Sequence, residues 1–178
     1  MRIAILHIGT VDMNLTSEVQ DGLCKVFPDA DCVILTDTMP VPEGEYNERR
    51  RQYYSSRILE KMRSYVPSSD VDCVLGLTAV DLYVPHLNFV FGEAQCPGKV
   101  AIISLYRLKP EFYGQPADRD LFVERSVKEA VHEVGHTLGL RHCSNSECIM
   151  FFSNNIQVTD TKKIEFCEKC WSNILQGI

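Results

Sequence analysis

The chain has 178 residues, a length that suits one domain with a sizeable buried core. Its formal net charge of −6 and scattered basic residues argue against a nucleic-acid-binding surface, and the run Arg49-Arg50-Arg51 lies in a Glu-rich pattern that predicts a solvated helix face. No apolar run approaches a membrane span, and the apolar start at residues 3–8 is too short for a signal peptide. We therefore expect a cytoplasmic monomer without a membrane partner.

Apolar periodicity divides the first part of the chain into alternating strands and helices. We expect strands at residues 2–8, 32–35 and 71–77, helices at 14–27 and 46–66 (the second stopped by Pro67), a hairpin of 87–94 with 99–105, and a loop at 106–119 before a helix capped by Asp118 or Asp120. This order implies βαβ units, and the hairpin adds an antiparallel strand. The predicted fold class is α/β, with a mixed, mostly parallel sheet and helices packed on it.

The most informative stretch reads H-E-x-x-H-x-x-G-x-x-H and comprises His132, Glu133, His136, Gly139 and His142. On a helix the first two histidines lie about 40° apart, one turn above the other, so both reach a single cation, and Glu133 can act on a water bound there. Gly139 allows a positive φ that ends the helix and lets His142 approach from another side. Three histidine ligands leave a fourth tetrahedral position for water, as in a catalytic zinc site.

The rest of this helix agrees with a metal site on one face. The apolar residues Val123, Val127, Ala130, Val131, Val134 and Leu138 all lie opposite the metal face. Arg125 and Glu129 lie about 20° and 60° from His132, on the metal side. Either residue could support the metal ligands or face the substrate, but we expect both to lie on a solvated helix face.

Four cysteines follow the helix, Cys143, Cys148, Cys167 and Cys170, in a C-x4-C…C-x2-C arrangement. Two disulfides and four buried thiols are alternatives, but the short spacings and the adjoining metal site favour a closed, structural zinc site. A polar turn at 153–155 precedes a final helix around residues 164–175.

Together these motifs resemble the archaemetzincins, a family of metzincin zinc metallopeptidases. The resemblance rests on residues 132–170 and implies His132, His136 and His142 as catalytic-zinc ligands, Glu133 as general base and the four cysteines as a second, structural site. It also implies Met150 as the Met-turn residue beneath the zinc. In some other metzincins a tyrosine follows two residues after that methionine, whereas this chain has Phe152.

The resemblance implies two zinc ions per chain and a single metzincin-like catalytic domain. Residues 1–139 are expected to form an upper lobe ending in the active-site helix, and residues 140–178 a small zinc-stabilised lower lobe. The implied reaction is hydrolysis of a peptide or protein substrate by a zinc-bound water that Glu133 activates. In metzincins a strand such as that of the predicted hairpin rims the cleft, and an extended substrate can pair with it.

Two other classes of function stay open at this point. A non-catalytic protein that binds zinc or peptides would keep the same motif, although such a protein has no need of Glu133. A zinc-finger interaction module would explain the four cysteines but not the three histidines. Hydrolysis assays on peptides of different length separate the first alternative from an enzyme.

Overall fold

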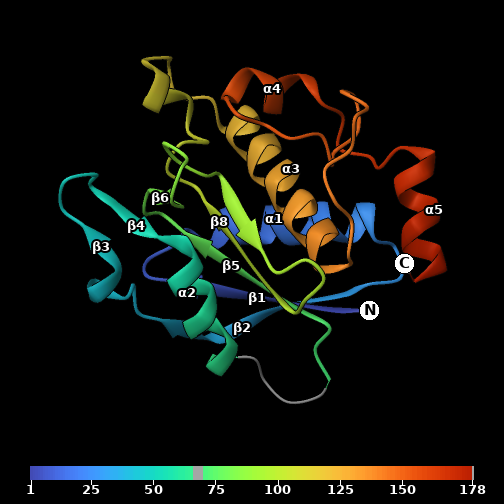
Figure 1. Cartoon of the computed structure of the whole chain (residues 1–178), viewed down its shortest axis with the longest axis horizontal. Coiled ribbons are helices and arrows are strands. Elements are labelled where there is room, and N and C mark those ends of the chain that lie inside the picture. The colour runs from blue at the N-terminus through green and yellow to red at the C-terminus, as the bar shows by residue number, and fades with distance from the viewer. Residues whose placement is uncertain (66–69, 178) are drawn as a thin grey trace.

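The computed structural model describes residues 1–65 and 70–177 and contains a five-stranded sheet (Figure 1). In spatial order the strands are β2 (Asp31–Met39), β1 (Arg2–Ile8), β5 (Cys73–Thr78), β8 (Val100–Ser104) and β7 (Gly92–Ala94). The first four are parallel, and β7 pairs antiparallel with β8 at the edge. The predicted class, including the antiparallel edge strand, is confirmed.

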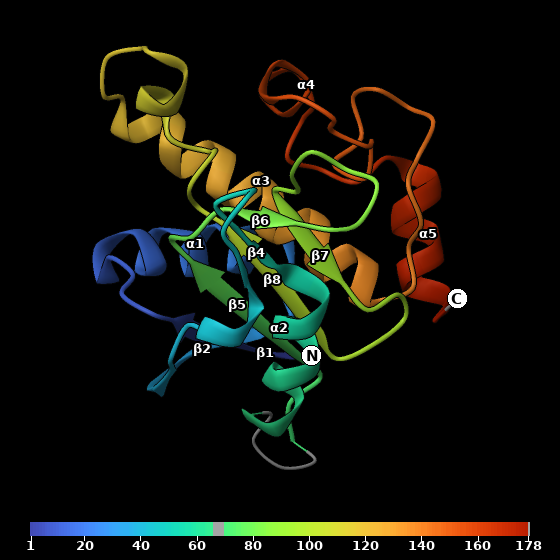
Figure 2. The same cartoon turned by 60° about the vertical axis from the view of Figure 1, so that its left-hand side comes forward.

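Helices cover both faces of this sheet (Figures 1 and 2). Ile3 and Ile5 of β1 pack with α1 (Met13–Val26) and α3 (Arg119–Thr137), whereas the alternate residues Ala4 and Leu6 pack with α2 (Ser55–Met62). Strands buried on both faces explain the near-continuous apolar runs in the sequence. Burial of each Ile or Leu side chain contributes about 1.5–3 kcal/mol, which holds the layers together.

The predicted helix at 46–66 is wrong in its first half. Residues 46–54 form β3 (Tyr46–Asn47) and β4 (Gln52–Tyr54), which join β6 (Leu82–Tyr83) in a second sheet of three strands. Tyr46 and Tyr53 pack across this hairpin with ring centroids 4.9 Å apart, and Arg50 donates hydrogen bonds to the carbonyls of Leu87 and Asn88. These tertiary contacts override a weak helix propensity.

Only the second half of that prediction becomes helical, as α2 followed by the 3-10 turn η2 (Arg63–Tyr65). The predicted end at Val66 and the stop at Pro67 lie outside the described residues. The exposed Arg49-Arg50-Arg51 run lies in the β3–β4 turn, so it is not the helix face that the Glu-rich pattern predicted. Arg50 also lies 4.4 Å from the centroid of the Tyr83 ring.

The other predicted elements are present with shifted ends. The hairpin forms with a shorter first strand, and the final helix is α5 (Glu168–Gln176). The polar turn at 153–155 leads into α4 (Ile156–Thr161), which the sequence reading missed, and two further 3-10 turns are η1 (Glu43–Glu45) and η3 (Pro110–Tyr113).

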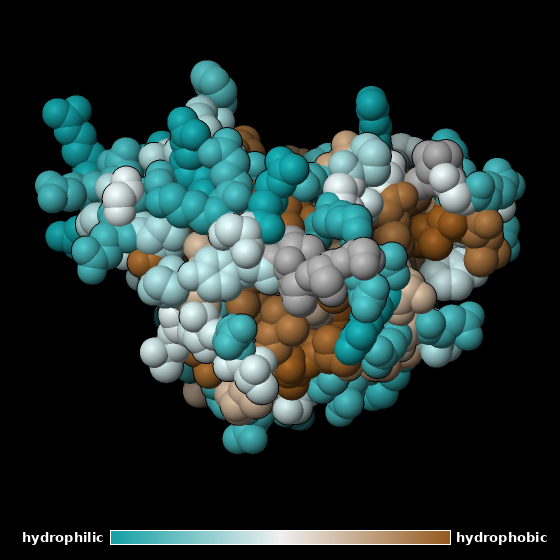
Figure 3. Space-filling model, turned by 90° about the horizontal axis from the view of Figure 1, so that it is seen from below, coloured by the Kyte–Doolittle hydropathy of each residue, from teal (hydrophilic) through white to brown (hydrophobic). Residues whose placement is uncertain are grey.

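Hydrophobic residues are exposed on the underside of the molecule, where α2 and β2 lie (Figure 3). With eight residues α2 covers only part of the sheet, and Val33 and Leu35 of the edge strand β2 stay partly exposed. Among residues 1–65 and 70–177, no helix is long and apolar enough to cross a membrane.

Candidate metal centres and active site

Helix α3 positions the motif through local interactions. Asp118 caps its first turn by accepting a hydrogen bond from the backbone N–H of Leu121 (3.0 Å). Of the two predicted caps, Asp118 and Asp120, the helix uses Asp118. Val127 and Val131 bury the opposite face in the core. At the far end Gly139 adopts φ +92°, which ends the helix and turns the chain as predicted.

The structure brings the three histidines together. One ring nitrogen from each of His132, His136 and His142 lies within 4.8 Å of the others, and the Nε2 atoms of His132 and His136 are 3.2 Å apart. Tetrahedral zinc with Zn–N distances of about 2.05 Å separates two ligand nitrogens by about 3.3 Å. The three side chains therefore fit one zinc ion.

Hydrogen bonds orient the two helical imidazoles. His132 Nδ1 lies 2.8 Å from the carbonyl oxygen of Ile149, and His136 Nδ1 lies 2.7 Å from that of Leu140. A carbonyl only accepts, so each Nδ1 carries the proton and each Nε2 presents a lone pair. Two lone pairs that face each other at 3.2 Å repel unless a cation lies between them.

Burial favours the neutral form of these three histidines. It lowers the pKa of His132 well below its ordinary value, with the Lys162 charge and the His136 charge as the next causes. Burial also lowers the pKa of His136 and of His142. Neutral imidazoles are the form that binds metal.

Glu133 lies in the same place and has a free oxygen. The residue is 4% exposed, and its Oε2 has no hydrogen-bond partner among the described residues. Burial raises the pKa of Glu133 well above its ordinary value, and the charges of Glu129 and Glu93 add to this while Lys162 opposes it. A dication held by the histidines would favour the ionised form.

The four cysteines also form one cluster, with all four Sγ atoms within 4.8 Å of one another. The Sγ atoms of Cys143 and Cys167 are 3.8 Å apart, which is too long for a disulfide but matches the edge of a tetrahedron with Zn–S bonds of about 2.3 Å. The backbone N–H of Cys167 donates to Cys148 Sγ at 3.3 Å. Burial raises the pKa of Cys167, but hydrogen bonds from Cys170 and the neighbouring thiols outweigh this and lower it to about 7. The cluster fits a closed zinc site.

Met150 and Phe152 follow the cysteine loop. Met150 is fully buried, and its sulfur packs so closely against Gly135 of α3 that a Cβ there would lie 2.6 Å from it. This places Met150 beside α3, whereas its position beneath a zinc ion stays a prediction. The exposed ring of Phe152 lies 4.8 Å from that of His142.

A cleft of about 630 Å³ runs between the edge strand β7 and the segment 152–154, and the three histidines line it. Its wall beside β7 is mainly apolar, with Phe89 and Phe91 among the lining residues. Among the described residues, its charged lining consists of carboxylates from Glu93, Glu129 and Glu133 and includes no lysine or arginine. The predicted hairpin strand thus rims the candidate site.

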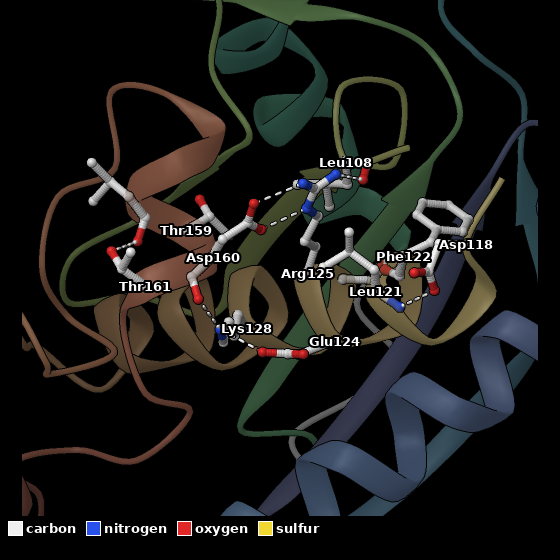
Figure 4. A network of polar contacts seen from close by, with 12 residues as sticks. Leu108, Asp118, Leu121, Phe122, Glu124, Arg125, Lys128, Thr159, Asp160 and Thr161 are labelled. Carbon is white, nitrogen blue, oxygen red and sulfur yellow. Dashed lines mark hydrogen bonds and ion pairs between the residues drawn. The ribbon is translucent and has the colours of Figure 1, made fainter. Parts of the chain in front are cut away.

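The expectation that Arg125 and Glu129 lie on a solvated face is wrong. Arg125 is 2% exposed and forms two hydrogen bonds of 2.7 Å with the carboxylate of Asp160 on α4 (Figure 4). Glu129 is 3% exposed, and its Oε1 lies 3.2 Å from Lys162 Nζ and accepts from Thr159 Oγ1 at 3.3 Å. The predicted angles around the helix put both residues on the side of α3 that α4 covers. Because α4 was not predicted, the sequence analysis had no partner to assign to either residue. Lys162 carried no signal of its own.

Comparison with known proteins identifies the family. Residues 4–176 match Peptidase family M54. An archaemetzincin of Methanocaldococcus jannaschii is 43% identical over 176 residues, which cover 96% of this chain and 90% of the relative. An archaemetzincin of Pyrococcus furiosus is 47% identical over 171 residues, which cover 94% of this chain and 89% of the relative. The chain belongs to peptidase family M54, the archaemetzincins.

Solved structures agree over nearly the whole chain. The crystal structure of an archaemetzincin from Archaeoglobus fulgidus, complexed with malonate, has a TM-score of 0.83 and 40% identity and covers 97% of this chain and 99% of that one. A zinc-dependent peptidase from Methanocorpusculum labreanum has a TM-score of 0.86 and 32% identity with the same coverage of 97% and 99%. Membership of this family supports a zinc metallopeptidase, and the fold is that of its solved members.

Proposed function

We propose that the protein is a metzincin-type peptidase that hydrolyses peptide bonds in the cleft between β7 and the segment 152–154. The observation that carries the proposal is the pair of facing Nε2 atoms 3.2 Å apart, in the same cleft as a buried carboxylate with a free oxygen. A zinc ion held by His132, His136 and His142 would act as a Lewis acid toward a water molecule and a carbonyl group.

The side chains of this chain do the remaining work. The Oε2 of Glu133, which has no hydrogen-bond partner among the described residues, accepts a proton from the attacking water and then passes this proton to the leaving amine. The carbonyls of Ile149 and Leu140 hold the imidazoles of His132 and His136 in the ligating orientation. The apolar wall excludes water around the reacting groups.

An extended peptide or protein segment is the proposed substrate. Because β7 lies at the edge of the sheet, it offers backbone groups to which such a segment can add as a further strand. Gly92 of β7 lies against Glu133, so a strand paired there passes close to the proposed base. We further propose a cytoplasmic monomer without nucleic-acid or membrane partners.

The four-cysteine cluster is proposed as a second, structural zinc site. Cys143 and Cys148 belong to the loop after α3, and Cys167 and Cys170 to the start of α5, so one ion ties the two segments together. We propose residues 140–178 as a lower lobe that depends on this ion and residues 1–139 as the upper lobe.

Glu133→Gln tests the assignment of the base. With zinc loaded, we expect kcat for a hydrolysed peptide to fall by about 10³-fold while zinc content stays unchanged, because the carboxylate is not a ligand. Glu124→Gln, at an exposed residue of the same helix outside the cleft, is the matched control and should leave kcat unchanged. Loss of zinc in Glu133→Gln would make the carboxylate a ligand. Full activity in that variant would reject the proposed mechanism.

A further inference from the structure

A lysine is buried behind the cleft. The side chain of Lys162 is 0% exposed, and its Nζ lies 3.2 Å from Glu129 Oε1 but makes no well-aligned hydrogen bond within the described part of the chain. Removing an ammonium group from water costs several kcal/mol, and a buried ion pair often stabilises a fold no better than apolar side chains of similar size. Stability alone is therefore a weak reason for a lysine here.

The fold does not need this pair to attach α4 to α3. Arg125 already binds the carboxylate of Asp160 with two hydrogen bonds, and Lys128 Nζ donates to the carbonyl oxygen of Asp160 at 3.1 Å (Figure 4). Both contacts join the same two helices further from the histidines along α3. Glu129 lines the cleft, and its Oε1 is held both by the hydrogen bond from Thr159 Oγ1 of α4 and by the charge of Lys162, which directly follows α4.

The carboxylate of Glu129 would compete for the metal unless another residue holds it in place. It precedes His132 by three residues and Glu133 by four, so it lies on the metal-facing side of α3 and lines the cleft with them. Carboxylates bind zinc readily, and the candidate site leaves one ligand position open. Two neighbouring carboxylates also repel each other. A free Glu129 would thus disturb both the metal and the proposed base.

We propose that Lys162 is a positioning residue of the hydrolytic site: its buried ammonium holds the Glu129 carboxylate away from the metal and leaves Glu133 as the one free carboxylate beside it. The inference rests on the proposed function. Lys162 and Glu129 then have opposite effects on a bound cation, because one repels it and the other attracts it.

Four variants test this role in the zinc-loaded protein: Lys162→Met, Glu129→Gln, the double variant with both changes, and Lys128→Met as control. Lys128 is a second buried lysine between α3 and α4, but its partner Glu124 lies outside the cleft. For each variant we would measure thermal stability, kcat and KM on one peptide, and the rate at which a chelator removes the first zinc ion.

We expect Lys162→Met to slow the loss of zinc by about threefold or more, because Glu129 is freed to attract the ion, and to lower kcat by about tenfold. Glu129→Gln should instead speed the loss of zinc, because an unpaired ammonium remains. The double variant should restore both zinc loss and kcat to within about twofold of the wild type, since no net charge is left over. Lys128→Met should lower thermal stability but change neither quantity.

The opposite signs of the two single variants are the decisive result, because loss of packing alone would change zinc loss in the same direction in both. Equal rates of zinc loss in all variants, or a Lys162→Met defect that Glu129→Gln does not rescue, would overturn the inference. If the wild-type protein hydrolyses no peptide, the proposed function fails, and the zinc-loss rates still decide whether Lys162 acts on the metal site.

Discussion

Gly92 is the residue of the edge strand β7 that faces the proposed base. A Cβ atom built on Gly92 would lie 2.6 Å from both Cγ and Oε1 of Glu133, whereas ordinary contacts begin at 3.4 Å. Gly92 does not adopt a positive φ, so alanine fits the strand backbone without strain. The substitution Gly92→Ala therefore acts on Glu133 and not on the conformation of β7.

The carboxylate of Glu133 must move by about 0.8 Å to accept this methyl group, and a misplacement of about 1 Å can cost about 10²-fold in rate. We expect kcat to fall by about 10- to 100-fold, with zinc content unchanged and the melting temperature within a few degrees of the wild type. Peptide hydrolysis, metal analysis and thermal unfolding measure these quantities. Gly44→Ala is the control, because nothing lies within 4 Å of a Cβ there. Wild-type kcat in folded, zinc-loaded Gly92→Ala would refute the reasoning.

Two further predictions concern the metals and the helix contacts. Metal-replete protein should contain two zinc ions. Mild chelation should remove about one of them and abolish activity with little change in circular dichroism, because the open histidine site exchanges before the closed cysteine site. Unfolding in the same step as the loss of activity would contradict this prediction. Arg125→Met should lower the free energy of unfolding by about 2–3 kcal/mol in urea titrations, because it leaves Asp160 unpaired; a change below about 0.5 kcal/mol would show that the ion pair contributes little.

Local signals explain what could be predicted from the sequence. Three features depend on residues within a few positions of one another: the helical spacing of the motif histidines, the cap at Asp118 and the turn at Gly139. The parallel strands were readable because burial on both faces leaves continuous apolar runs. The spacing of the cysteines was as informative, since its two short pairs predicted the cluster of four Sγ atoms that the structure contains.

The missed features depend on contacts between distant residues. The β3–β4 hairpin is held by the Tyr46–Tyr53 pair and by Arg50, whose carbonyl partners lie 37 and 38 residues away. Helix α4 has six residues, too few to show an apolar period, although Asn155 caps it by accepting from the N–H of Val158. Without α4, the burial of Glu129 could not be foreseen.

The two proposed metal sites share one short segment, and this sets the order in which they depend on each other. His142 is followed directly by Cys143, and Cys148 directly precedes Ile149, whose carbonyl orients His132. Loss of an ion from the cysteine cluster would therefore release one histidine ligand and the orienting acceptor of another. Loss of an ion from the histidines would leave the cysteine loop tied to α5 by the ion proposed there. We therefore expect chemistry at the proposed histidine site to depend on an ion in the cysteine cluster, whereas the fold of the proposed lower lobe should not depend on an ion at the histidines.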